Sequence, residues 1–174
     1  MLGFKMAKLG LENFVAGLVG GGGGGGNVGL PPGMDSGKVR AMRSRLQGEW
    51  GERMAEEFLL GRGWKVIGRN VRPCRKDRRC EIDRVFLSEA GGVVFVEVKT
   101  HLARTEYDSR LKSVDARKKR VLLRACANWL QLARWKGDFR FDVVEVWGSH
   151  ASKVPPEIDH IENVPLFGAN WRFW

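Results

Sequence analysis

The spacing of apolar and polar residues predicts regular structure from about residue 41 onward. Apolar side chains recur at helical spacing over residues 42–60, which predicts a helix that ends at Gly61 and Gly63. A second run at helical spacing predicts a longer helix over residues 114–135, ended by Gly137. The two predicted helices enclose a segment whose apolar residues follow a different period.

Short apolar runs in this segment and after the second helix predict β-strands. Residues 64–70 and 81–87 are two of them, and residues 139–147 form a later one. Residues 93–100 (VVFVEVKT) are apolar nearly throughout their first half, which is typical of a buried central strand. Residues 158–163 are a candidate for a last edge strand. The order α-β-β-β-α-β, with this optional final strand, predicts an α/β fold with a mixed central sheet flanked by helices.

The N-terminal quarter differs from this pattern because residues 20–26 are seven consecutive glycines. A glycine run loses the most backbone entropy on ordering and offers no side chains for packing. We therefore expect a flexible extension over residues 1–40, a folded domain over residues 41–165 and an aromatic C-terminal tail over residues 166–174. Translation from Met34 or Met42 is an alternative that the sequence leaves open.

Charge adds information about partners. The 174 residues include 30 Lys and Arg against 20 Asp and Glu, so the net charge of +10 favours a polyanionic partner. Both nucleic acid and an acidic membrane surface fit that charge. No apolar run approaches the roughly 20 residues that span a bilayer. The N-terminal apolar stretch is short and poorly amphipathic, so we expect no membrane partner. Three cysteines cannot all be paired, so a reducing, cytoplasmic location is expected.

Two carboxylates interrupt apolar strands, where an unpaired charge is costly. Asp83 lies in one strand, and Glu97 lies in the next with Lys99 on the same strand face. Two carboxylates beside a lysine could bind Mg²⁺ or Mn²⁺ and hydrolyse a phosphodiester, with Lys99 orienting water or neutralising phosphate charge. The alternative is a structural ion pair between Glu97 and Lys99 on an edge strand.

The spacing of these residues resembles a nuclease signature. Asp83, followed fourteen residues later by Glu97-Val98-Lys99, resembles the PD-(D/E)xK motif. A wider set of motifs between about residues 48 and 164 resembles the YraN-like family of uncharacterised bacterial proteins. That family has a restriction-endonuclease-like fold similar to that of archaeal Holliday-junction resolvases. The further matching positions are Gly51, Glu52, Gly63, Trp64, Asn70, Glu81, Ile82, Phe95, Val96, Thr100, Val114, Lys118, Trp129, Leu130, Arg140, Phe141, Asp142, Val143 and Val144.

The resemblance implies a role for each residue of the signature. Asp83 and Glu97 would ligate the metal together with the Val98 carbonyl, and Lys99 would be the catalytic lysine. Glu52, on the first helix, would reach the metal directly or through water.

The resemblance is incomplete next to this site. Glu81 shares a face with Asp83 and would support the site or act as a ligand. The family usually has Gly where this chain has Cys80, and an apolar residue where this chain has Arg84. Neither departure removes a ligand that the resemblance implies.

Basic residues are concentrated near these motifs in the sequence. Backbone N–H groups at the start of the second helix could bind phosphate. Basic side chains also lie at this helix start, where they oppose the helix dipole, so helix stability does not explain their presence. Lys118 matches a family lysine, and we expect it to contact a backbone phosphate. Phosphate contacts carry no sequence preference, so recognition by shape is expected. The candidate nucleic-acid-binding residues are Arg75, Lys76, Arg117, Lys118, Lys119 and Arg120.

Two functions remain open at this point. The first is a metal-dependent endonuclease that hydrolyses phosphodiesters in structured or branched DNA. The second is a nucleic-acid-binding module that keeps the nuclease fold and cleaves nothing. The resemblance also admits a homodimer, because resolvase-like enzymes that cut two strands symmetrically are typically dimers.

Overall fold

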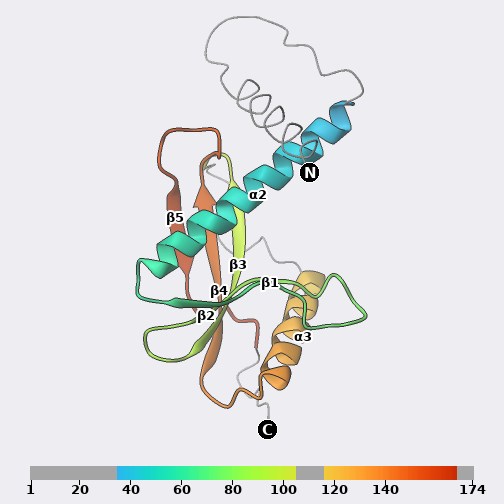
Figure 1. Ribbon diagram of the computed structural model, residues 1–174, viewed down its shortest axis with the longest axis vertical. Coiled ribbons are helices and arrows are strands. Elements are labelled where there is room, and N and C mark those ends of the chain that lie inside the picture. The colour runs from blue at the N-terminus through green and yellow to red at the C-terminus, as the bar shows by residue number, and fades with distance from the viewer. Residues whose placement is uncertain (1–34, 105–115, 168–174) are drawn as a thin grey trace, which may run out of the picture.

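The computed structural model describes residues 35–104 and 116–167, which form an α/β fold (Figure 1). The order of elements agrees with the sequence prediction, including the optional final strand. Neither described helix has a stretch long and apolar enough to cross a bilayer. The elements are α2 (Ser36–Leu60), β1 (Lys65–Val71), β2 (Ile82–Leu87), β3 (Val93–His101), α3 (Ala116–Leu132), β4 (Phe139–Trp147) and β5 (Glu157–Ile161).

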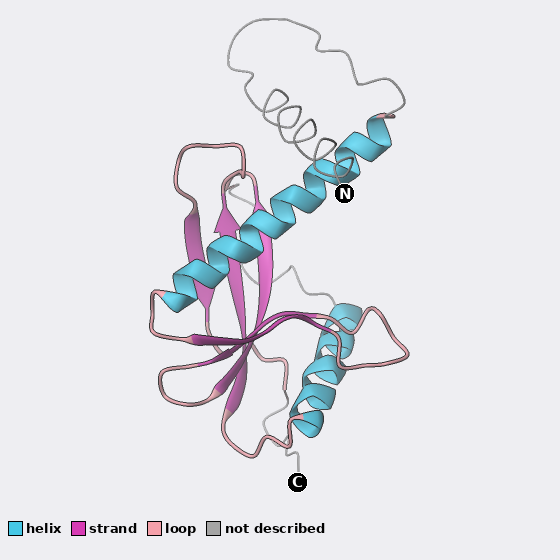
Figure 2. Cartoon of the chain, in the orientation of Figure 1, coloured by secondary structure: helices cyan, strands magenta, loops and turns pink. Residues whose placement is uncertain are grey.

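The five strands form one mixed sheet in the order β1-β2-β3-β4-β5. Neighbouring strands pair antiparallel except β3 and β4, which run parallel. Parallel neighbours need a long crossover connection, and α3 lies in that connection (Figure 2). β3 therefore lies in the middle of the sheet, as its apolar composition predicts.

The two helices cover opposite faces of the sheet. Alternate residues of β3 show this division, because Val93 and Phe95 pack in a core with α3, whereas Val94 and Val96 pack in a second core with α2. Successive residues of a strand point to opposite faces, so a single apolar strand supplies both cores. This double burial explains why residues 93–96 carry no polar side chain.

Helix α2 begins at Ser36, ahead of the predicted start at residue 42. The Asp35 side chain caps the helix by accepting a hydrogen bond from the backbone N–H of Lys38 at 2.8 Å. Val39, in the first turns of the helix, is buried. Residues 36–40 are thus helical, although they were expected to belong to the extension. Residues 1–34 of the extension lie outside the described residues.

Helix α3 ends at Leu132, earlier than the predicted residue 135. Arg134 adopts a left-handed conformation with φ of 50°, and the Trp135 N–H donates to the Leu130 carbonyl at 3.0 Å. These are features of a Schellman-type helix end, which usually carries glycine at the left-handed position. Because arginine occupies that position, the sequence contains no glycine to mark the end of α3 there. The predicted start of this helix, at residue 114, lies outside the described residues.

The described part of the aromatic tail packs on the domain. Leu166 and Phe167 contact the core that lies beneath α3. The Phe167 ring meets the Phe139 ring edge-to-face at 5.0 Å. Residues 168–174 lie outside the described residues.

The close approach of α2 to β3 generates a test of the fold. A methyl group on Gly51 would lie 1.9 Å from the Thr100 hydroxyl oxygen, whereas one on Gly48 would meet no atom within 4 Å. We expect Gly51→Ala to lower the free energy of unfolding by about 1–3 kcal/mol through overpacking. Gly48→Ala should raise it by about 0.5–1 kcal/mol, because alanine is the better helix former. Urea denaturation of both variants measures this, and equal stabilisation by both would contradict the close packing.

Candidate active site

The candidate site forms where β2 and β3 separate. The last ladder pair between these strands is Arg84 with Val96. One step further, the backbone N–H of Val98 donates to Asp83 Oδ2 at 2.8 Å instead of to a strand partner. The Asp83 side chain thus replaces a ladder hydrogen bond, and this contact fixes its carboxylate beside β3.

Glu97 is the buried centre of the site, with 3% of its side chain exposed. Lys99 Nζ lies 2.8 Å from Glu97 Oε1, so the prediction that the two share a face is confirmed. Lys118 Nζ, from the first turns of α3, contacts the same oxygen. Two ammonium groups therefore compensate one buried carboxylate. The ion pair that the sequence suggested is present, but it lies on a central strand and not on an edge strand.

The pKa of Asp83 is raised to about 7. Burial of the carboxyl group is the largest cause, and the negative charge of Glu97 is the next. The hydrogen bond from the Val98 N–H acts in the opposite direction but does not compensate. Burial, together with the charge of Glu97, thus keeps Asp83 partly protonated at neutral pH.

Lys118 stays charged in this environment. Burial works to lower the pKa of its ammonium group, but the charge and hydrogen bond of Glu97 outweigh burial and raise that pKa. The side chain is 43% exposed, although its ammonium group contacts the buried Glu97. The structure brings Lys118 into the carboxylate site, while its contact with a backbone phosphate stays a prediction.

Glu52 is held next to the site by Arg84. Arg84 Nη1 lies 2.8 Å from Glu52 Oε2, and Arg84 Nε lies 2.7 Å from Glu56 Oε2. The same guanidinium donates to the backbone carbonyl of Asp83 at 2.8 Å. The residue that departs from the family pattern therefore joins α2 to β2. The charge of Glu52 still contributes to the raised pKa of Asp83, and its direct contact with a metal stays a prediction.

Glu81 forms an ion pair with Arg72. It precedes β2, and its Oε2 lies 2.8 Å from Nη2 of Arg72. This pair lies partly in solvent, because the Arg72 side chain is 56% exposed. A supporting or ligand role for Glu81 stays a prediction.

The carboxylates Asp83 and Glu97 fit a hard divalent cation. Mg²⁺ prefers carboxylate oxygens and keeps several waters, so one or two protein carboxylates suffice. A cation would stabilise the ionised form of Asp83, whose pKa is raised by burial and then by the charge of Glu97. Within residues 35–104 and 116–167, no group of three or more His, Cys, Asp or Glu side chains is arranged to hold a metal. Ligation by the Val98 carbonyl stays a prediction.

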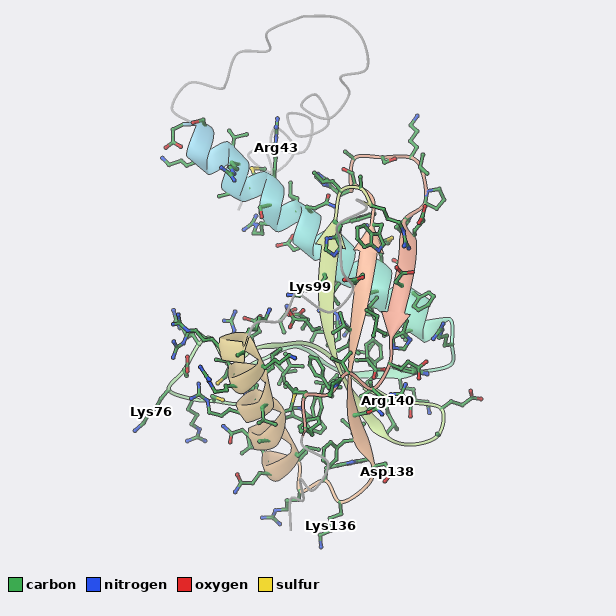
Figure 3. All side chains as sticks on the ribbon, turned by 180° about the vertical axis from the view of Figure 1, so that it is seen from behind. Arg43, Lys76, Lys99, Lys136, Asp138 and Arg140 are labelled. Atoms are coloured by element: carbon green, nitrogen blue, oxygen red, sulfur yellow. The ribbon has the colours of Figure 1, made fainter. Side chains whose placement is uncertain are left out.

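The remaining basic candidates lie on two elements. Arg117 and Lys118 border a cavity of about 220 Å³ together with Arg79. Arg75 and Lys76 are exposed on the connector between β1 and β2, and Figure 3 shows Lys76 pointing away from the fold. Nucleic-acid binding by each of them stays a prediction, as it does for the half-buried Lys119 and the exposed Arg120.

Sequence reasoning missed a second set of cations beside the site. Arg40 and Arg43, on α2, line a groove of about 680 Å³ whose wall also includes Lys99. Arg40 fell within the expected extension, so it was not placed on a helix. The Asp35 cap signal ahead of it could have identified the longer helix.

The raised pKa of Asp83 predicts how stability changes with pH in the metal-free protein. The unfolded chain releases this proton near pH 3.8, whereas the folded chain keeps it to about pH 7. The folded state binds more protons between these values, so the free energy of unfolding falls as pH rises through this interval. The Asp83→Asn side chain cannot ionise. We expect the free energy of unfolding of this variant to exceed that of wild type by roughly 1–4 kcal/mol at pH 8 and to equal it near pH 4.

Urea unfolding in chelator between pH 4 and pH 8 measures this difference. Asp138→Asn is the control, since Asp138 lies in the exposed turn before β4. Parallel curves for wild type and Asp83→Asn would contradict the burial of an ionisable Asp83.

Comparison with known proteins identifies the family of the chain. Residues 51–146 match the model of the uncharacterised protein family UPF0102. A UPF0102 protein from Symbiobacterium thermophilum is 45% identical over 105 residues, which cover 59% of this chain and 83% of the relative. Another from Pseudomonas paraeruginosa is 41% identical over 122 residues, which cover 69% of this chain and 92% of the relative. The chain therefore belongs to family UPF0102, the YraN-like family that its motifs resemble.

Proposed function

We propose that the protein is a metal-dependent endonuclease of the PD-(D/E)xK type that hydrolyses phosphodiesters in structured or branched DNA. The observation that carries this proposal is the pair of carboxylates, Asp83 and Glu97, on neighbouring strands with Lys99 against one of them. The raised pKa of Asp83 supports it, because strongly perturbed carboxyl groups cluster at functional sites. The net charge of +10 supports a polyanionic substrate.

The arrangement of the fold supports the same proposal. We take the αβββαβ order, with α2 and α3 on opposite faces of a mixed sheet, as a restriction-endonuclease-like core. In this core the start of α3 lies beside the carboxylates, because Lys118 reaches Glu97. Cations there counter the repulsion between the carboxylates and an approaching phosphate.

Each side chain of the site has a task in the proposed hydrolysis. Asp83 and Glu97 would hold Mg²⁺ or Mn²⁺, which when bound supplies a polarised phosphate and a more acidic water. Lys99 Nζ would donate a hydrogen bond to the attacking water or to a phosphate oxygen on which charge develops. Lys118 would neutralise charge on the same phosphate. The Val98 N–H keeps the Asp83 carboxylate oriented throughout.

A second candidate is a nucleic-acid-binding module that keeps this fold without cleaving. One observation favours it, because Glu97 already has two lysine partners and Glu52 is paired with Arg84. Such pairing could compensate the buried charges with no metal. The two candidates differ in one outcome, because only the nuclease would cleave bound nucleic acid when a divalent cation is present.

A cleavage assay separates the candidates. Labelled single strand, duplex, flap, four-way junction and structured RNA are incubated with Mg²⁺, Mn²⁺ or chelator. We expect wild type to cut branched DNA only with metal, Lys99→Ala to lose roughly 10²–10³-fold in rate, and Asp83→Ala to be inactive.

Lys136→Ala is the matched control, since this lysine lies at the far end of the fold from Lys99 (Figure 3). It should cut at the wild-type rate. Salt-sensitive binding by wild type, with no cutting of any substrate in either metal, would exclude the nuclease proposal and favour the binding module.

A further inference from the structure

A basic groove lies directly beside the carboxylate site. It has a volume of about 680 Å³ and runs between the N-terminal half of α2, the end of β3 and the segments that follow β3 and β4. Arg40 and Arg43 line its helical wall, and Lys99, Ser149 and His150 line the opposite side. Figure 3 shows Arg43 on the part of α2 that extends past the sheet and Lys99 on β3. Because Lys99 also contacts Glu97, the groove and the site share a residue.

The walls of the groove are fastened to each other. Gln47 Nε2 donates to the Gly148 carbonyl at 2.7 Å, and Gln47 Oε1 accepts from the His150 backbone N–H at 3.1 Å. The His150 ring Nδ1 lies 2.9 Å from the same oxygen. One helix side chain thus holds the loop after β4 in place. The groove therefore exists before any ligand binds, which lowers the entropic cost of binding.

The charge of the groove selects an anion. Its described lining has three cationic side chains, Arg40, Arg43 and Lys99, and includes no Asp or Glu. Arg40 and Arg43 are one turn apart on the same helix face, so both guanidinium groups can reach one chain of phosphates. Elsewhere on α2, Arg45 and Arg53 pair with carboxylates of the helix itself. Within the described part of the chain, Arg40 and Arg43 thus differ from Arg45 and Arg53 in having no carboxylate partner on the helix.

The size of the groove selects the form of the anion. Its volume lies within the roughly 300–1,000 Å³ of sites that enclose small molecules, so the groove has room for about one or two nucleotides and cannot enclose a double helix. Val98 and Leu102 add apolar surface against which a base or sugar can pack, and Leu102 is 73% exposed. Alternating phosphate and base contacts are the usual way in which proteins bind single strands.

We propose that this groove binds an unpaired DNA strand that continues from the bond at the carboxylate site. This inference rests on the proposed nuclease function and specifies its substrate: DNA with a single-stranded segment next to the cut, such as a flap. Arg40 and Arg43 bind phosphates of that segment, and Lys99 contacts the phosphate nearest the site.

Binding measured without catalysis tests the inference. The full chain in chelator is titrated into a fluorescein-labelled oligothymidine and into a blunt duplex of equal length, at several salt concentrations. We expect Arg40→Gln/Arg43→Gln to weaken single-strand binding by roughly 10–30-fold at 0.1 M salt. Its slope of log affinity against log salt should fall in magnitude by about 1.4, which is 0.7 for each lost phosphate contact.

The matched control is Arg45→Gln/Arg53→Gln, which removes the same charge from the same helix. It should bind the single strand as wild type does, and both variants should bind the blunt duplex like wild type. Wild-type affinity of the Arg40/Arg43 variant for the single strand would overturn the inference. Equal losses for single strand and duplex would also overturn it, since they would indicate a general basic surface.

A flap-cleavage assay with Mg²⁺ separates this inference from the proposed function. If the Arg40/Arg43 variant selectively loses single-strand binding but wild type cuts no substrate, the proposal for the groove stands and the nuclease proposal is excluded. Flap cleavage that is unaffected by the Arg40/Arg43 variant would keep the nuclease and exclude the groove as its substrate track.

Discussion

The burial of one carboxylate in the central strand constrains the rest of the structure. Glu97 follows four apolar residues of β3 and is almost completely removed from solvent. A lone charge at such a depth would be prohibitively costly. The protein meets this cost with cations from two elements, Lys99 on the same strand and Lys118 on α3. The start of α3 is therefore tied to the sheet by electrostatics as well as by its apolar face.

A second set of ion pairs holds α2 against the other face of the sheet. Arg84 is buried and bonds Glu52 and Glu56, one turn apart on the helix. The charge and hydrogen bonds of Arg69, and then those of Arg84, keep the pKa of Glu56 low against the opposing effect of its burial. Removing one partner from such a buried network leaves an uncompensated charge, which is far more costly than losing a surface ion pair. The position of Glu52 thus depends on a residue of β2.

The sequence predicted the elements well because their signals are local. The apolar runs of β3 and β4 and the helical spacing of α2 are properties of neighbouring residues, and each element appears where its pattern indicates. Helix ends were less predictable. Asp35 is a recognisable N-cap signal ahead of α2, but the left-handed Arg134 that ends α3 has no glycine to mark it in the sequence.

The site was predictable in part for the same reason. Period-two spacing placed Glu97 and Lys99 on one face, and the adjacent strand placed Asp83 near them. The inward orientation of Lys118 and the clamp by Arg84 are contacts between residues far apart in sequence, and no spacing rule reveals them. The groove at Arg40 and Arg43 requires the packing of α2 against the loop after β4, which only the folded chain shows.

The unbroken length of α2 has a mechanical consequence. A helix rises 1.5 Å per residue, so its 25 residues make a rod of about 37 Å. The close contact of Gly51 with Thr100 lies between two further attachments of this rod to the sheet. Gln47 bonds the loop after β4 on one side, and Glu52 and Glu56 bond Arg84 on the other. One rigid helix therefore carries both the groove arginines and the carboxylate beside the site, so the spacing between them is set by the helix itself.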